Sequence, residues 1–135
     1  MAGYSGTPLA KRLGIKPGTR LLAVNAPADY AALLDPLPEN VAFLRAGADE
    51  LDVVHLFTKT RPELIKLIDR YMRKIKQEGA IWVSWPKKAS GIPTEVTEDT
   101  VRELALPLGL VDIKVCAVDE TWSGLKLVIR KENRR

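Results

Sequence analysis

The segment Asp52-Val53-Val54-His55-Leu56-Phe57 decides the fold class that the sequence predicts. Its nearly continuous apolar run is typical of a parallel strand that is covered on both faces, because helices then pack on either side of the sheet. The segment that follows, from Thr60 to Gly79, places apolar residues at helical spacing behind a capping box of Thr60 and Glu63. A buried strand followed by an amphipathic helix indicates an α/β unit.

Further strands and helices are expected to alternate on both sides of this unit. We expect strands at residues 20–24, 41–44, 80–85, 111–118 and 125–129, and helices at 9–13, 29–34 and 97–108. This alternation favours an open, mostly parallel sheet with helices on both faces, and the turn at 119–124 predicts a C-terminal antiparallel hairpin. The sequence thus predicts one α/β domain over residues 1–135, with an N-terminal segment at 1–18 and a basic tail at 130–135.

Composition excludes several classes of protein. Hydrophobic residues make up 46% of the chain and charged residues 28%, as in ordinary globular proteins. No apolar run approaches the roughly 20 residues of a membrane helix and the start lacks a signal pattern, so we expect a cytoplasmic protein without membrane contact. The single Cys116 and single His55 cannot supply a disulfide or a structural zinc site, and both are expected to be core residues of strands. We therefore expect no metal.

The net charge of +4 is concentrated at the two ends of the chain. Residues 1–20 carry four basic residues and no acidic residue, and residues 130–135 carry four basic residues and one acidic residue, which leaves −3 on the body. Basic ends on a mildly acidic body are more typical of solvated termini than of a phosphate-binding groove. Weak binding of RNA or DNA through the termini remains a secondary hypothesis, and nucleic acid is not the expected partner.

The order of elements resembles a class I methyltransferase sheet with a shortened middle. The lead-in Leu13-Gly14-Ile15-Lys16-Pro17-Gly18-Thr19-Arg20-Leu21-Leu22 is also similar to the approach to that family's first strand. The resemblance implies a Rossmann-like fold and, in an intact member, binding of S-adenosylmethionine.

A second resemblance is more specific and spans the chain. The segments Ala2–Leu9, Trp85–Gly91 and Val118–Lys126 are similar to a small bacterial family described as a domain of unknown function. That resemblance implies no activity.

The methyltransferase pattern fails where the cofactor would bind. Such a site needs a glycine turn after the first strand and an acidic residue after the second, which binds the ribose hydroxyls. Here the first turn reads Val24-Asn25-Ala26-Pro27-Ala28, and Arg45-Ala46-Gly47-Ala48 precedes the first acidic residue, Asp49. We therefore expect no cofactor.

Ligands of open parallel sheets bind beyond the carboxyl ends of the strands, where loops and helix N-termini converge. This rule selects the candidate ligand-binding residues Lys59, Arg61, Lys87, Lys88, Ser90, Asp119, Glu120 and Trp122. The cations among them lie beside two helix N-termini and could hold a carboxylate or phosphate, although such loop residues are also typical of plain solvated surface.

Three functions remain open at this stage. One is the weak binding of RNA or DNA through the basic termini described above. The leading hypothesis is a non-enzymatic binding or regulatory module that recognises an anionic small molecule or a protein partner at this edge. The alternative is a small enzyme, such as a divergent methyltransferase, in which Asp119 or Glu120 acts as acid or base with Lys87 or Lys88. Acidic residues are also ordinary turn formers and Trp122 could cover the edge as an apolar lid, so no catalytic residue is assigned.

Overall fold

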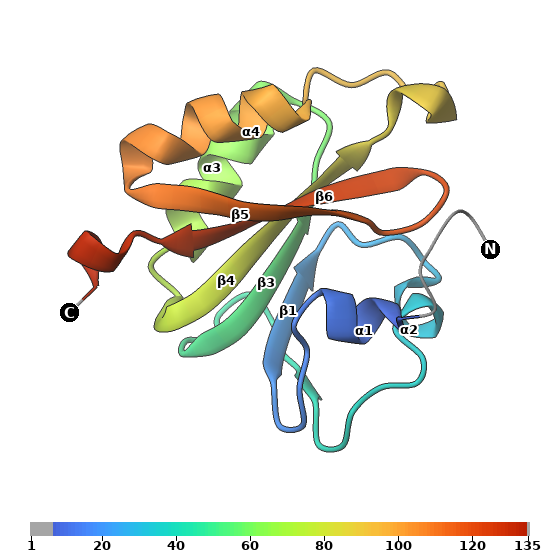
Figure 1. The fold of residues 1–135 in the computed structure, drawn as a ribbon, viewed down its shortest axis with the longest axis vertical. Coiled ribbons are helices and arrows are strands. Elements are labelled where there is room, and N and C mark those ends of the chain that lie inside the picture. Colours follow the sequence, from blue (N-terminus) through green and yellow to red (C-terminus); the bar gives the residue numbers. More distant parts are fainter. Residues whose placement is uncertain (1–6, 135) are drawn as a thin grey trace.

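The computed structural model describes residues 7–134, and in this range the chain forms a single six-stranded sheet flanked by helices (Figure 1). The strands are β1 (Arg20–Val24), β2 (Ala42–Phe43), β3 (Leu51–Phe57), β4 (Ile75–Pro86), β5 (Leu110–Ala117) and β6 (Trp122–Ile129). The α-helices are α1 (Leu9–Arg12), α2 (Tyr30–Leu33), α3 (Arg61–Tyr71) and α4 (Glu98–Ala105). Short 3₁₀ turns are η1 (Lys88–Ser90), η2 (Leu106–Leu108) and η3 (Lys131–Asn133).

The sheet has the order β2-β1-β3-β4-β6-β5. β1 pairs in parallel with β2 and β3, and β3 pairs in parallel with β4. β6 lies antiparallel between β4 and β5, so β5 runs in the same direction as the first four strands. The predicted mostly parallel sheet with a C-terminal antiparallel hairpin is confirmed.

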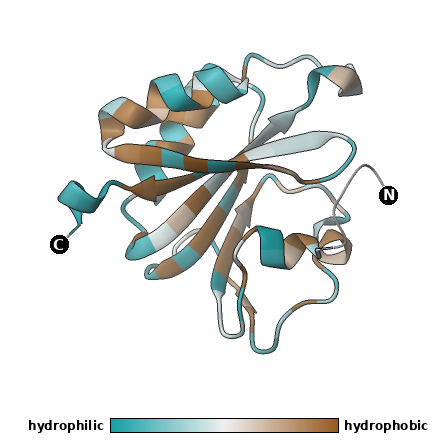
Figure 2. Ribbon diagram, in the orientation of Figure 1, coloured by the Kyte–Doolittle hydropathy of each residue, from teal (hydrophilic) through white to brown (hydrophobic). Residues whose placement is uncertain are grey.

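Two apolar cores form because the sheet is covered on both faces. One lies between the sheet and the pair α3 and α4, and includes Leu64, Ile68 and Val101. The other lies under α1 and α2, and includes Leu13 and Tyr30. In Figure 2 the strongest hydrophobic colouring follows the strands, as expected for a sheet buried between two layers.

The predicted helix from Thr60 was too long. Its N-terminus is as expected, because the Thr60 side chain accepts a hydrogen bond from the Glu63 N–H. The helix ends at Tyr71, however, and Ile75 already pairs with Leu51 as the first residue of β4. Gly79 belongs to this strand, where an added Cβ would lie 2.9 Å from the Leu51 carbonyl oxygen, so its role is close approach between strands rather than helix termination.

Candidate functional site

The position at which this fold would bind a ligand lies between β1 and β3. The chain leaves β1 to form β2 on one side and returns to form β3 on the other, which makes this the topological switch point of the sheet. In open α/β sheets the ligand lies outside the carboxyl ends of the strands at that point. The residues that surround it here are Asn25 after β1 and Thr58 after β3.

Hydrogen bonds within the chain bridge this switch point. The Glu63 carboxylate accepts from the Thr58 hydroxyl at 2.6 Å and, through its other oxygen, from the Asn25 side-chain amide at 3.4 Å. The same amide lies 3.4 Å from the Phe57 carbonyl oxygen. Asn25 has φ +58°, a left-handed conformation that favours glycine and that asparagine tolerates. An asparagine therefore makes the turn that a cofactor-binding sheet makes with glycine, and its side chain hydrogen-bonds across the switch point.

The N-terminus of α3 is likewise occupied from within the chain. Besides the Thr60 cap, the Glu95 carboxylate accepts from the backbone N–H of Arg61 at 2.9 Å. The Arg61 guanidinium pairs with Glu103 of α4 at 3.4 Å. The free amides and the positive end of this helix, which could have received an external anion, thus already face a carboxylate.

The β5–β6 turn uses its acidic residue for structure. The Asp119 carboxylate accepts from the backbone N–H groups of Thr121 and Trp122 at 2.8 and 2.7 Å, and so closes the turn. The Lys87 ammonium group donates a hydrogen bond to the Asp119 carbonyl oxygen at 2.6 Å. Trp122 is half-buried and meets the Phe57 ring edge to face, with 5.1 Å between the ring centroids. Glu120 is exposed at the tip.

The predicted site residues fall into two groups along the carboxyl edge. Lys59 and Arg61 lie beside the segment 94–95, which hydrogen-bonds to the Lys59 carbonyl oxygen and the Arg61 N–H. Lys87, Ser90, Asp119 and Trp122 lie around the hairpin turn, and the Ser90 hydroxyl donates to the Lys87 carbonyl oxygen at 2.7 Å. Within residues 7–134, no hydrogen bond or ion pair joins the two groups. Lys59 and Lys88 project from exposed positions.

Tyr30, His55 and Ser84 form a buried network of hydrogen bonds on the sheet. The His55 ring is fully buried and hydrogen-bonds to the Tyr30 hydroxyl through Nδ1 at 2.8 Å and to the Ser84 hydroxyl through Nε2 at 2.7 Å. Burial lowers the pKa of His55 to about 3 and raises the pKa of Tyr30 well above its usual range. His55 is therefore a satisfied core residue, as predicted. Its two partners come from α2 and β4 and could not be paired with it from sequence.

Cys116 is also a core residue, as predicted. Its side chain is buried beside the α1 layer, and burial raises the pKa of its thiol although the Arg12 guanidinium, 3.3 Å from Sγ, opposes that shift. A thiol with a raised pKa is a weak nucleophile. In the described part of the chain, no three His, Cys, Asp or Glu side chains gather as a metal site, and no helix is long and apolar enough to span a membrane.

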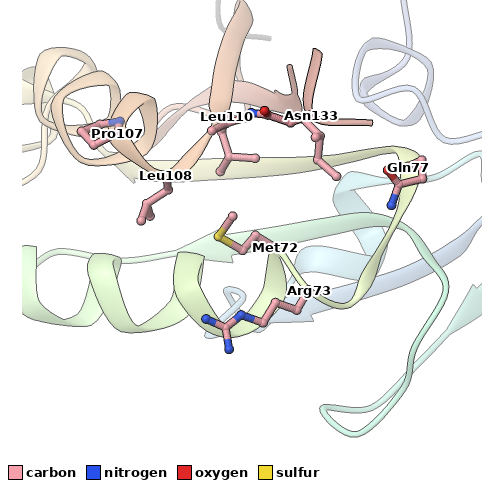
Figure 3. A pocket seen from close by; sticks show the side chains of 9 residues that line it. Met72, Arg73, Gln77, Pro107, Leu108, Leu110 and Asn133 are labelled. Carbon is pink, nitrogen blue, oxygen red and sulfur yellow. Dashed lines mark hydrogen bonds between the residues drawn. The ribbon is translucent and has the colours of Figure 1, made fainter. Parts of the chain in front are cut away.

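Two pockets lie at the opposite, amino-terminal ends of the strands. The larger, of about 730 Å³, is shown in Figure 3: Met72 lies at the end of α3, and Leu108 and Leu110 face it from across the opening. The smaller, of about 480 Å³, lies between the α1–β1 loop and the starts of β3 and β4. Sequence reasoning did not find either pocket, because it searched only the carboxyl edge.

Residues 43–131 match the family described as "Protein of unknown function (DUF3052)". The chain belongs to this family. The matched range includes β3 to β6 and both helices of the α3–α4 layer, and the resemblance noted in the sequence is thereby confirmed. A search of curated proteins found no match.

Several solved structures with a similar fold are methyltransferases. A SAM dependent methyltransferase from Aquifex aeolicus superposes with a TM-score of 0.63 at 15% identity, over 90% of this chain and 88% of that chain. A precorrin-6y C5,15-methyltransferase from Geobacter metallireducens gives 0.59 at 15% identity, over 90% and 86%. The mitomycin 7-O-methyltransferase MmcR gives 0.62 at 10% identity, over 84% of this chain and 49% of that chain. At these identities the likeness establishes a Rossmann-like methyltransferase fold.

Proposed function

We propose that this protein is a non-enzymatic binding or regulatory module on a methyltransferase-type fold, and that its carboxyl edge recognises an anionic group. The observation that carries the proposal is the Asn25–Glu63–Thr58 bridge across the switch point. A nucleotide-bound cofactor would have to break these hydrogen bonds and approach a turn whose proline, Pro27, offers no N–H.

The exposed cations of the edge supply the recognition. Arg61 is paired with Glu103 and Lys87 holds the hairpin turn, so Lys59 and Lys88 are the ammonium groups that reach outward. Trp122, half-buried against Phe57 at the same edge, offers an aromatic contact. Because the bridge crosses the switch point where a small ligand would bind, the geometry favours an acidic segment of a protein partner over a small molecule.

The test uses a fluorescein-labelled peptide of ten glutamates as the acidic probe. We expect saturable binding by fluorescence anisotropy, and about tenfold weaker binding for the double variant Lys59→Glu/Lys88→Glu. The matched control is Lys66→Glu/Lys131→Glu, which makes the same change in net charge at two exposed positions outside the edge. Equal losses in both double variants would mean that only net charge matters and would remove the proposal.

The second candidate function is a divergent methyltransferase, which the fold of the solved relatives favours. In that case Asp119 or Glu120 would serve as acid or base with Lys87 or Lys88. Isothermal titration calorimetry with S-adenosylmethionine and S-adenosylhomocysteine separates the two functions. The binding module gives no heat of binding, whereas binding that weakens in Asn25→Trp would favour the methyltransferase candidate in its place.

A further inference from the structure

Two lysines from distant parts of the sequence line the smaller pocket, and a third lies beside one of them, at the end of the sheet opposite to the proposed edge. Lys126 of β6 and Lys16 of the α1–β1 loop line the pocket, and Lys114 of β5 stands directly opposite Lys126 in the antiparallel ladder. Residues directly opposite each other share one face of a sheet, with their Cβ atoms about 5 Å apart. Like charges in such a pair are unfavourable, so the arrangement needs an explanation.

Acidic residues in the pocket do not neutralise these lysines. Asp52 is engaged on both oxygens, by Lys76 at 2.9 Å and by the backbone N–H of Arg20 at 2.8 Å. Glu78 lines the pocket from an exposed position. Among the residues the structure describes, the ion pairs found include none of Lys16, Lys114 or Lys126. The excess positive charge is therefore available to a ligand.

Lys126 is partly desolvated. Its ammonium lies against the backbone of Gly14, where an added Cβ would be 3.7 Å from Nζ. Partial burial lowers the pKa of Lys126, and the charges of Lys114 and Lys16 lower it further. An anion placed among the three ammonium groups would reverse this effect, because opposite charge favours the protonated amine.

The loop that carries Lys16 is ordered before any ligand arrives. The Lys16 N–H donates to the Thr19 hydroxyl at 2.8 Å, and the Thr19 N–H donates back to the Lys16 carbonyl oxygen at 3.1 Å. Ile15, which precedes Lys16, is buried in the core beneath α1. A receptor whose backbone is fixed in advance loses less entropy on binding.

We propose that Lys16, Lys114 and Lys126 form a binding site for a small phosphorylated molecule at the amino-terminal end of the sheet. The pocket volume of about 480 Å³ is in the range of small-molecule sites. Three ammonium groups match the several negative oxygens of a diphosphate or phosphate ester. Glu78, which lines the same pocket from an exposed position, repels an extended polyanion, which favours a small ligand over a nucleic-acid backbone.

The test is isothermal titration calorimetry with inorganic pyrophosphate at low salt. We expect one site per chain, at least tenfold weaker in Lys126→Met and weakened to a smaller degree in Lys114→Gln. Lys66→Gln removes one exposed lysine from the outer face of α3 and should keep the affinity within twofold. Thermal unfolding of each variant, without ligand, verifies that it is folded; Lys114 is exposed, so its variant remains informative if Lys126→Met does not fold.

Nuclear magnetic resonance of the lysine side chains adds a second readout, measured at an ionic strength matched with sodium chloride because screening alone would also weaken the repulsion from Lys114 and Lys16. Pyrophosphate should raise the pKa of Lys126 toward its ordinary value, and sodium chloride at the same ionic strength should raise it less. Absence of binding, or equal weakening in Lys126→Met and Lys66→Gln, would overturn the proposal. So would binding of a twenty-nucleotide single-stranded DNA through these lysines without binding of pyrophosphate. The carboxyl-edge variant Lys59→Glu/Lys88→Glu should bind pyrophosphate normally, so the two proposals can fail independently.

Discussion

The two ends of the parallel strands differ in whether their charged side chains have partners within the chain. At the carboxyl end, the carboxylates of Glu63, Glu95 and Asp119 each accept hydrogen bonds from nearby residues of the same chain. At the amino end, Lys126 and Lys114 face each other without a counter-ion in the described chain. The fold predicts where a relative would bind its ligand, but the partners of each side chain decide whether this chain still has the free groups to do so.

The largest expected effect concerns the buried network behind the closed end. Because burial lowers the pKa of His55 to about 3, while the unfolded residue has a pKa of 6.5, the unfolded state binds an extra proton between those values. The stabilising contribution of His55 is therefore fully present above pH 6.5 and is lost as the pH falls toward 3. From pH 7 to pH 4.5 this one group should remove about 2.5 kcal/mol from the free energy of unfolding.

Urea unfolding of the wild type and of His55→Gln at several pH values measures this effect. His55 is the only histidine in the chain, so the difference between the two pH slopes isolates its titration from that of the carboxylates. The variant should be less stable at pH 7, because Tyr30 and Ser84 lose their partner, but its stability should depend less on pH. Parallel slopes would mean that His55 is solvated in the native state.

The next effect tests whether the carboxylate of the hairpin turn is structural. Asp119→Ala leaves the N–H groups of Thr121 and Trp122 without their acceptor and should cost about 1–2 kcal/mol of stability. Glu120→Ala, at the exposed neighbouring position, should change stability by less than about 0.5 kcal/mol. Chemical denaturation gives both values. If both variants change stability by the same small amount, the Asp119 carboxylate is not needed for the turn and is free to bind a ligand or transfer a proton.

Much of the fold follows from local patterns in the sequence. The apolar run of β3 and the Thr60 cap each predicted an element that the structure contains, because burial on two faces and capping act over a few residues. The end of α3 could not be predicted in this way. Ile75 continues the helical spacing, but pairing with Leu51 across the sheet is the stronger interaction and draws it into β4.

The candidate sites depended on longer-range information. The missing glycine after β1 could be seen in the sequence. The Asn25–Glu63 hydrogen bond across the switch point could not, because it joins residues 38 positions apart. Lys16, Lys114 and Lys126 carry no motif at all. They meet only because β6 inserts between β4 and β5 and sets Lys126 opposite Lys114, a register that periodicity does not specify.

The smallest expected effect has opposite signs for two lysines of one pocket. Lys126→Met keeps the aliphatic stem and removes a repelled charge, so it should raise the free energy of unfolding by about 0.2–1 kcal/mol. Lys76→Met breaks the 2.9 Å ion pair with Asp52 and should lower it by about the same amount. Burial alone would raise the pKa of Asp52, but hydrogen bonds from Arg20 and Lys76 hold it below its ordinary value.

Urea denaturation at low and high salt checks both changes, since screening should reduce each of them. If Lys126→Met is more stable and yet loses pyrophosphate, Lys126 is retained at a cost to folding, which is the behaviour of a residue kept for binding. If Lys126→Met is instead destabilised as much as Lys76→Met, the lysine contributes to packing or to an attraction within the chain. The two ends of the sheet would then no longer differ in whether their charged groups have partners within the chain.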